Sequence, residues 1–248
     1  MTSVILGHIP FAVIGIFIFG LPSFVGIEFI ITSILLHFLY PIFLLNAYKF
    51  GELSEIYPVA RGLSPLIIII VSFIFFHEGI SFYETIGILI ISFSLMTYGL
   101  KSFSEKKSNF KGFGLAVVTG FLIASYSIVD GFGARATQNP IGFYSFVTIM
   151  SGIFFYFYAS IKDKNIIQKV LINEKKSFFI GGTASYLAYV IVVWACLYLP
   201  IAVVSSLRET SILFAVLFGF LFLKEKISLT KFFLILGLFC GVIILRIS

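Results

Sequence analysis

Charged residues are scarce in this chain of 248 residues. Asp, Glu, Lys and Arg together make up 11% of it, whereas an ordinary soluble domain holds roughly 25%. Apolar residues account for 60% of the chain, and its mean hydropathy is +1.12. The scarcity of charge excludes a soluble globular protein, so we expect an all-α polytopic membrane protein embedded in the lipid bilayer.

Residues that form disulfides or bind metals are also few. Cys196 and Cys240 fall within apolar runs, where we interpret them as small apolar side chains, so no disulfide is implied. His8, His37 and His77 lie far apart without the spacing of metal ligands, so no metal site is expected. The sequence has no phosphate-binding loop, nucleophile elbow or His-Glu-x-x-His motif, and we therefore do not expect an enzyme.

Long apolar runs recur along the whole chain. A bilayer core is crossed by about 20 apolar residues of helix. On that length we predict about nine spans, at 5–21, 24–48, 55–76, 82–100, 112–133, 140–161, 177–199, 201–223 and 230–246. The longest connections, 101–111 and 162–176, are too short for a soluble catalytic domain. Function is therefore expected inside the helix bundle.

The basic residues follow a membrane pattern. The net charge is +6, and all 13 lysines lie in alternate connections between the predicted spans, with Arg135 and Arg246 on the opposite side. By the positive-inside rule the lysine side is cytoplasmic, so the chain would start inside and end outside after nine crossings. This distribution predicts membrane topology and no nucleic-acid partner.

A repeat connects the two parts of the chain. The stretch RGLSPLIIIIVSFIFFHEGIS at 61–81 returns as RETSILFAVLFGFLFLKEKIS at 208–228, with eight of 21 positions identical at an offset of 147 residues. The copies lie on the third and eighth spans, so they cross the membrane in opposite directions. The fold class expected is an inverted repeat of five-helix halves, 1–100 and 112–248, an architecture common among transporters.

The symmetry predicts one further helix in the first half. The partner of the span at 112–133 would fall before residue 1. We expect either a true start codon further upstream, or a nine-helix variant that functions incompletely, differently or with a partner.

The segment 186–228 carries the pattern of a known family. An apolar helix ends in a proline, a stretch of small and hydroxyl residues and a second apolar helix follow, and a Leu-x-Glu-x-Ile-Ser turn precedes the last helix. The residues that fill these places are Pro200, Ser205, Ser206, Leu223, Glu225, Ile227 and Ser228, and the first half echoes them with Pro58, Pro65, Glu78, Ile80 and Ser81. With this pattern the chain resembles the EamA-type transporters of the drug/metabolite transporter superfamily, and the stretch 126–135 resembles the end of a helix in one branch of that family.

The resemblance covers about residues 24–248. It implies a multi-pass carrier in the cell (inner) membrane that exports small polar metabolites or amino acids by alternating access, without a bound cofactor. Its members commonly keep the C-terminus cytoplasmic, whereas the lysines here place it outside. The absent helix leaves an alternative, a flippase-like or accessory membrane subunit. A homodimer, or a small membrane partner that supplies a helix, is compatible with either function.

Charges inside the spans are the first candidates for a substrate pathway. Arg208 and Glu209 lie about 10 to 12 Å into a helix that begins near Ile201. A charge at the bilayer centre costs ~2.5–3.5 kcal/mol and usually faces the bundle interior. Adjacent residues point about 100° apart, so Arg208 and Glu209 each need another partner. Ser205, Arg208 and Ser211 are expected to share one helix face.

Each candidate has a functional and a structural interpretation. Arg208 could bind a substrate carboxylate or phosphate, or snorkel to a surface, or form a structural ion pair. Its counterpart Arg61 could line the cavity or anchor a helix end. Asp130, in a stretch where Gly131 and Gly133 predict fraying, could pair with Arg208 or Arg61, take up a coupling proton, or cap the helix.

Aromatic and acidic residues complete the candidate set. Tyr126, Tyr189 and Trp194 could form the wall of a cavity, although packing is the common role of aromatics in a chain with 32 Phe, and Trp194 could be an interfacial anchor. The acidic residues Glu78 and Glu225 precede helices and are expected to be structural. Ser81 and Ser228 suit the N-cap positions there.

Overall fold

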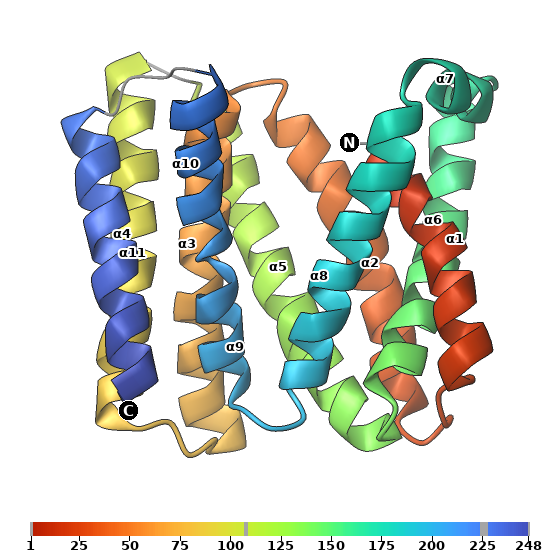
Figure 1. Ribbon diagram of the computed structural model, residues 1–248, viewed down its shortest axis with the longest axis horizontal. Helices are drawn as coiled ribbons and strands as arrows, with labels where there is room; N and C mark the ends of the chain where they lie inside the picture. Colours follow the sequence, from red (N-terminus) through yellow and green to blue (C-terminus); the bar gives the residue numbers. More distant parts are fainter. Residues whose placement is uncertain (1, 107–108, 224–227, 248) are drawn as a thin grey trace. The chain divides into compact units, whose positions relative to one another are not determined.

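The computed structural model describes residues 2–106, 109–223 and 228–247, and all regular structure in these ranges is helical (Figure 1). The helices are α1 (Thr2–Phe19), α2 (Ile27–Ala47), α3 (Leu53–Val71), α4 (Phe82–Lys106), α5 (Phe110–Thr137), α6 (Pro140–Lys162), α7 (Ile166–Asn173), α8 (Gly182–Ala195), α9 (Ile201–Arg208), α10 (Ser211–Leu223) and α11 (Leu229–Ile247). Two π-helical turns, η1 (Ser72–Phe76) and η2 (Ser177–Gly181), adjoin α3 and α8.

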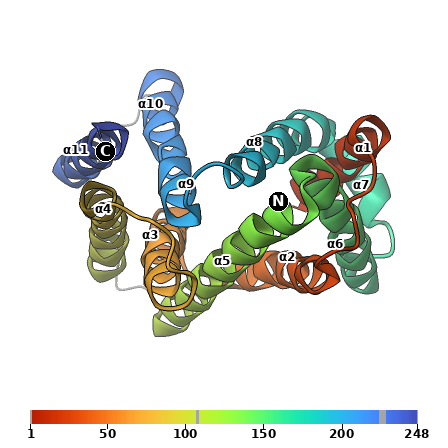
Figure 2. The same ribbon diagram turned by 90° about the horizontal axis from the view of Figure 1, so that it is seen from below.

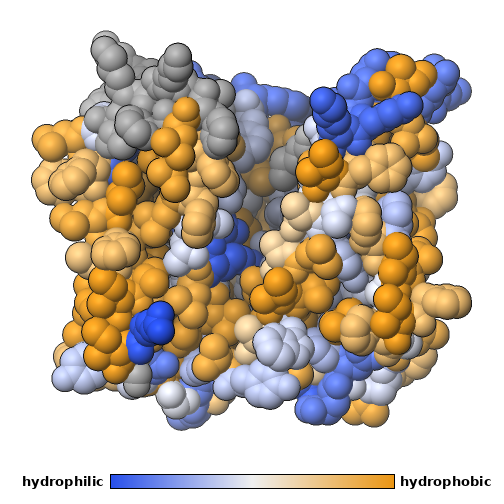
Figure 3. Space-filling model, in the orientation of Figure 1, coloured by the Kyte–Doolittle hydropathy of each residue, from blue (hydrophilic) through white to orange (hydrophobic). Residues whose placement is uncertain are grey.

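Nine helical segments of the described residues are long and apolar enough to cross a membrane. They correspond one to one with the nine predicted spans, and the prediction of an all-α polytopic membrane protein is confirmed. Large apolar side chains such as Phe17, 92% exposed, cover their outer faces, as a lipid environment requires. Figure 3 shows apolar side chains over much of the visible surface and hydrophilic side chains gathered over α7.

The short helix α7 is the one helix that lies in a predicted connection. Its Lys169 ammonium lies 2.5 Å from an oxygen of Asp163, which lies in the turn between α6 and α7. This hydrogen bond lowers the pKa of the exposed Asp163 carboxyl. An eight-residue helix is too short to span a bilayer core.

The chain divides into two compact units, each assembled from separate stretches of sequence. Unit 1 contains residues 1–39 and 128–198, and unit 2 contains residues 40–127 and 199–248. Each unit therefore draws helices from both of the sequence halves predicted above. The two predicted halves, 1–100 and 112–248, were inferred from the repeat in the sequence. This division and the inverted orientation of the two halves stay a prediction.

Unit 1 is built by α1 packing against α6, α8 and η2. The helices α1 and α8 approach closely at glycines, because a Cβ atom built on Gly182 would lie 2.6 Å from the backbone of Gly7. Phe143 and Tyr186 belong to the buried cluster of this unit, which also holds side chains of α1, α2 and α5.

Unit 2 is built by α4, which packs against α3 on one side and α11 on another, and by α9, which packs against α3 and α4. Figure 2 shows α4 beside both α3 and α11. Its buried cluster includes Ile56, Val59 and Phe103. At the crossing of α4 and α11, a Cβ atom on Gly87 would lie 2.9 Å from the carbonyl oxygen of Gly241, so small residues set this distance.

The predicted caps are confirmed at two helices. The Ser81 hydroxyl accepts from the Glu84 amide at 3.1 Å at the start of α4, and the Ser228 hydroxyl accepts from the Lys231 amide at 3.2 Å at the start of α11. Glu78 also caps a helix, but a different one from that expected. Its carboxylate accepts from the amide of Ile201 at 3.1 Å, the first residue of α9. Glu225 lies outside the described residues.

Candidate functional site

The eighth span is interrupted at the position of its charged residues. The predicted span over 201–223 is confirmed as a membrane-crossing segment over Ile201–Phe218, and within this segment α9 ends at Arg208 and α10 begins at Ser211. The amide of Glu209 donates to the carbonyl of Ser206 and that of Thr210 to Leu207, both at 3.1 Å. These bonds reach back three residues instead of four, so the helix tightens for one turn, as helices often do at functional hinges.

The Glu209 carboxylate lies at this tightened turn and is fully buried. Its Oε2 accepts from Nε of Arg61 on α3 at 2.8 Å, and its Oε1 lies 3.8 Å from Nε of Arg208. Glu209 therefore finds its close partner on another helix, as the directions of adjacent side chains predicted. Arg61, Arg208 and Glu209 form the arginine–glutamate cluster of unit 2, with a formal charge of +1 over the three residues.

Aromatic rings surround the two guanidinium groups. The guanidinium carbon of Arg208 lies 5.9 Å from the ring centre of Tyr126, and that of Arg61 lies 5.4 Å from the ring centre of Tyr57. The Tyr40 ring in turn packs on Tyr126 at 5.1 Å. Cations within about 6 Å of a ring face are stabilised by its quadrupole. Tyr126 thus lies next to the cluster, as a neighbour of Arg208.

Ser205 lies one turn before Glu209 on α9. It is 2% exposed, and its hydroxyl has no hydrogen-bond partner among the described residues. Of the residues on the predicted polar face, Ser205 is buried, whereas Ser211 is exposed.

A second buried polar group lies in unit 1, around Asp130 on α5. The expected fraying is wrong here, since α5 continues through Gly131 and Gly133 to Thr137 and leaves Asp130 only 1% exposed. The carboxylate oxygen Oδ2 accepts from the Tyr189 hydroxyl at 2.8 Å and lies 2.8 Å from Nε2 of His37.

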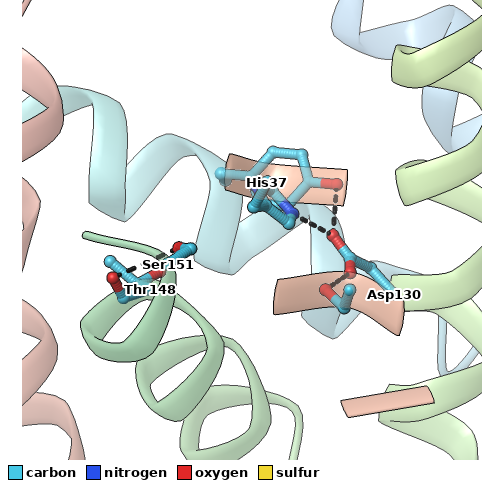
Figure 4. A network of polar contacts seen from close by, with 6 residues as sticks. His37, Asp130, Thr148 and Ser151 are labelled. Carbon is cyan, nitrogen blue, oxygen red and sulfur yellow. Dashed lines mark hydrogen bonds and ion pairs between the residues drawn. The ribbon is translucent and has the colours of Figure 1, made fainter. Parts of the chain in front are cut away.

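Ser33, one turn before His37 on α2, completes the group by donating to Oδ1 of Asp130. We call Ser33, His37, Asp130 and Tyr189 the aspartate–histidine network. From the sequence we considered Arg208 or Arg61 as the partner of Asp130. The partners among the described residues are instead Ser33, His37 and Tyr189. Figure 4 shows the ring of His37 directed at Asp130, and Thr148 and Ser151 on the neighbouring helix α6.

Sequence reasoning missed His37 and Ser33. His37 lies inside a predicted span, and an ionisable side chain at such a position indicates function by itself. Its ring also packs against Tyr144 and Tyr189, with 5.7 Å between ring centres in both cases. Trp194, by contrast, is 48% exposed and stacks on Tyr198 at 5.2 Å, so the structure does not bring it into the aspartate–histidine network.

Buried charges on apolar spans are typical of the substrate and ion pathways of membrane transport proteins. The sequence model of the EamA-like transporter family matches residues 110–247, which is more than half of the chain. The chain belongs to this family, and it is a membrane transporter of the drug/metabolite type. None of the curated proteins matches the chain.

Proposed function

We propose that this protein is a secondary transporter that exports small polar metabolites or amino acids across the cytoplasmic membrane by alternating access. Membership of a transporter family supports the general function. The observation that supports a polar substrate is the arginine–glutamate cluster, in which two largely buried arginines and one fully buried carboxylate lie at a tightened helical turn.

The charge of the cluster favours a substrate with an anionic group. Arg61 and Arg208 bring ten N–H donors and two positive charges, while Glu209 brings one carboxylate. A substrate carboxylate or phosphate adds the acceptors and the negative charge that balance the cluster, and the planar fork of arginine binds such groups with two parallel hydrogen bonds. Arg208 is the residue we assign to this contact, because Arg61 is the closer partner of Glu209.

The broken helix supports movement at this site. A tightened turn between α9 and α10 separates two helical segments, and backbone groups at such interruptions commonly contact the substrate in transporters. Ser205 adds a buried hydroxyl to the same turn of α9 that carries Arg208. Binding of a substrate at 205–209 is thus coupled to a segment whose backbone geometry can change.

The test compares metabolites in the medium of cells that produce the intact chain, Arg208→Ala or Arg246→Ala at equal membrane abundance. Arg246 is the matched control, since it is an exposed arginine in the last turn of α11. We expect Arg208→Ala to lower export of the transported compound at least tenfold and Arg246→Ala to leave it within twofold. Export that survives in Arg208→Ala contradicts the assigned contact, and loss of folded protein in that variant indicates a structural role.

A further inference from the structure

We propose that the aspartate–histidine network of unit 1 is a proton-binding site, through which a pH gradient drives the transporter. This inference rests on the proposed function for what is driven, but the binding site stands on its own geometry. Its ligand is one proton, held between Nε2 of His37 and the carboxylate of Asp130, which lie 2.8 Å apart.

The cost of a charge inside a membrane span favours the proton-bound form of the His37–Asp130 pair. With one proton shared between them, His37 and Asp130 are formally neutral as a pair, either as two ions or as two neutral groups. Without that proton the pair carries one negative charge at a carboxylate that is 1% exposed. A single charge inside a span is costly. The pair is therefore stabilised in the proton-bound form, and release of the proton needs a compensating change such as water entry or a substrate charge.

The buried carboxylates of Asp130 and Glu209 have partners of different kinds. Histidine is the side chain whose charge changes between pH 5 and 8 in ordinary surroundings, whereas arginine keeps its proton at any physiological pH. Asp130 has a histidine partner and Glu209 has arginine partners. Protonation of Glu209 would leave two guanidinium charges without their carboxylate. Between Asp130 and Glu209, Asp130 is thus the one suited to exchange a proton.

Polar and aromatic groups from several helices surround the His37–Asp130 pair. Ser33 on α2 and Tyr189 on α8 donate to Asp130, and Tyr144 on α6 packs on the His37 ring. From α1, the buried Nε2 of His8 has no hydrogen-bond partner among the described residues, and His8 interacts electrostatically with His37.

Tyr186 on α8 stacks on Tyr144 and forms a hydrogen bond with Ser145, so it lies next to a ring that packs on His37. Hydroxyl groups and one further imidazole are thus among the groups around the pair. The hydroxyls of Ser33 and Tyr189 can stabilise the carboxylate when the proton leaves, and they do not compete for it as a lysine or arginine would.

In the transport cycle the proton moves opposite to the substrate. A proton enters from the acidic outer side, binds between His37 and Asp130, and leaves to the cytoplasm, while the substrate moves outward. No bond other than those to the proton forms or breaks, and the pH gradient supplies the free energy. With one proton exchanged for one neutral substrate, each unit of pH gradient supports about a tenfold accumulation of substrate.

The binding site is tested first without any substrate. The full-length protein in lipid nanodiscs, with isotope-labelled histidine, is titrated from pH 5 to 9 by NMR, and the His37 ring signals are assigned with His37→Gln and with His77→Asn, a variant at an exposed histidine. We expect the His37 signals to shift across this range, and their midpoint to move in Asp130→Asn. Signals that do not change with pH, or a midpoint unaffected by Asp130→Asn, overturn the proposal.

The coupling is tested in everted membrane vesicles with the compound that the export comparison identifies. A pH gradient is expected to raise uptake of that compound at least tenfold for the intact chain and for Glu28→Gln, an exposed carboxylate on α2. In Asp130→Asn and His37→Gln the gradient should have no effect, while exchange of labelled for unlabelled compound at equal pH stays within threefold.

The two proposals fail in different ways. Gradient-driven uptake that persists in folded Asp130→Asn overturns the coupling role, and so does loss of both uptake and exchange, which would make Asp130 part of the substrate path. If Asp130→Asn does not fold, His37→Gln decides by the same criteria. If the intact chain exports no compound, the proposed function fails, and the NMR titration alone decides whether the network binds a proton.

Discussion

The pairing of Arg61 with Glu209 makes a quantitative prediction about stability. Replacing Glu209 by glutamine keeps the size of the side chain but removes its charge, and leaves the Arg61 and Arg208 guanidiniums without the carboxylate at 2.8 and 3.8 Å. Removing one partner of a buried ion pair typically lowers stability by about 3–5 kcal/mol. We expect Glu209→Gln to reach this range, because Glu209 is fully buried and balances two cations.

The same charge count predicts a rescue. Arg61→Met removes one cation and leaves Arg208 to pair with Glu209, so it should cost less than Glu209→Gln. In the double variant only one cation is uncompensated within the cluster, and the double variant should therefore be more stable than Glu209→Gln alone. We expect a coupling energy of at least ~1.5 kcal/mol between the two substitutions, within the range for residues that share an ion pair.

The assay is reversible unfolding in mixed micelles, with Glu28→Gln as the control for an exposed carboxylate on a span. The free energy of unfolding is measured for the intact chain, both single variants and the double variant. Effects of Arg61→Met and Glu209→Gln that add within ~0.5 kcal/mol would show that the two side chains do not interact, and would refute the cluster. A control variant that loses as much stability as Glu209→Gln would also refute it.

Two further predictions concern a helix cap in unit 2 and a close helix crossing in unit 1. Ser81→Ala removes the acceptor for the Glu84 amide and should lower stability by about 1 kcal/mol, measured by the same unfolding assay. The control is Ser125→Ala on α5, a half-buried serine whose hydroxyl donates to the Phe121 carbonyl of its own helix; an effect no larger than that of the control would contradict the cap. Gly182→Ala places a Cβ atom 2.6 Å from the backbone of Gly7 and should cost about 1–3 kcal/mol. Gly114→Ala meets no atom within 4 Å and should be neutral or slightly stabilising, so equal effects of the two would contradict the close approach of α1 and α8.

Much of the architecture could be predicted because apolar runs of the required length fix where a chain crosses a membrane. The nine spans are confirmed on that basis. The caps at Ser81 and Ser228 were predicted because serine is a preferred N-cap residue, and they are confirmed as well. The break at Glu209 was missed because neither glycine nor proline marks it, and the change from four-residue to three-residue hydrogen bonds leaves no signal in hydropathy. The cap that Glu78 provides to α9 was missed because 123 residues separate Glu78 from Ile201.

The candidate site was only partly predictable for a similar reason. The repeat and the depth of the charges pointed to Arg61, Arg208 and Glu209 as a set, but their pairing depends on how α3 and α9 pack, which spacing along the chain does not determine. The aspartate–histidine pair spans 93 residues of sequence, and His37 carries no motif. The position of a histidine inside a span was the available signal. The flippase-like or accessory-subunit alternative stays a prediction, and so does a homodimer or small membrane partner.

The central claim is that this protein moves a small polar compound out of the cell. The most direct measurement is a comparison of metabolites in the medium and cytoplasm of cells that produce the intact chain and cells that do not, over the same growth. We expect at least one compound with a carboxylate or phosphate to rise in the medium and fall in the cytoplasm when the chain is present. Identical profiles at confirmed membrane abundance would contradict it.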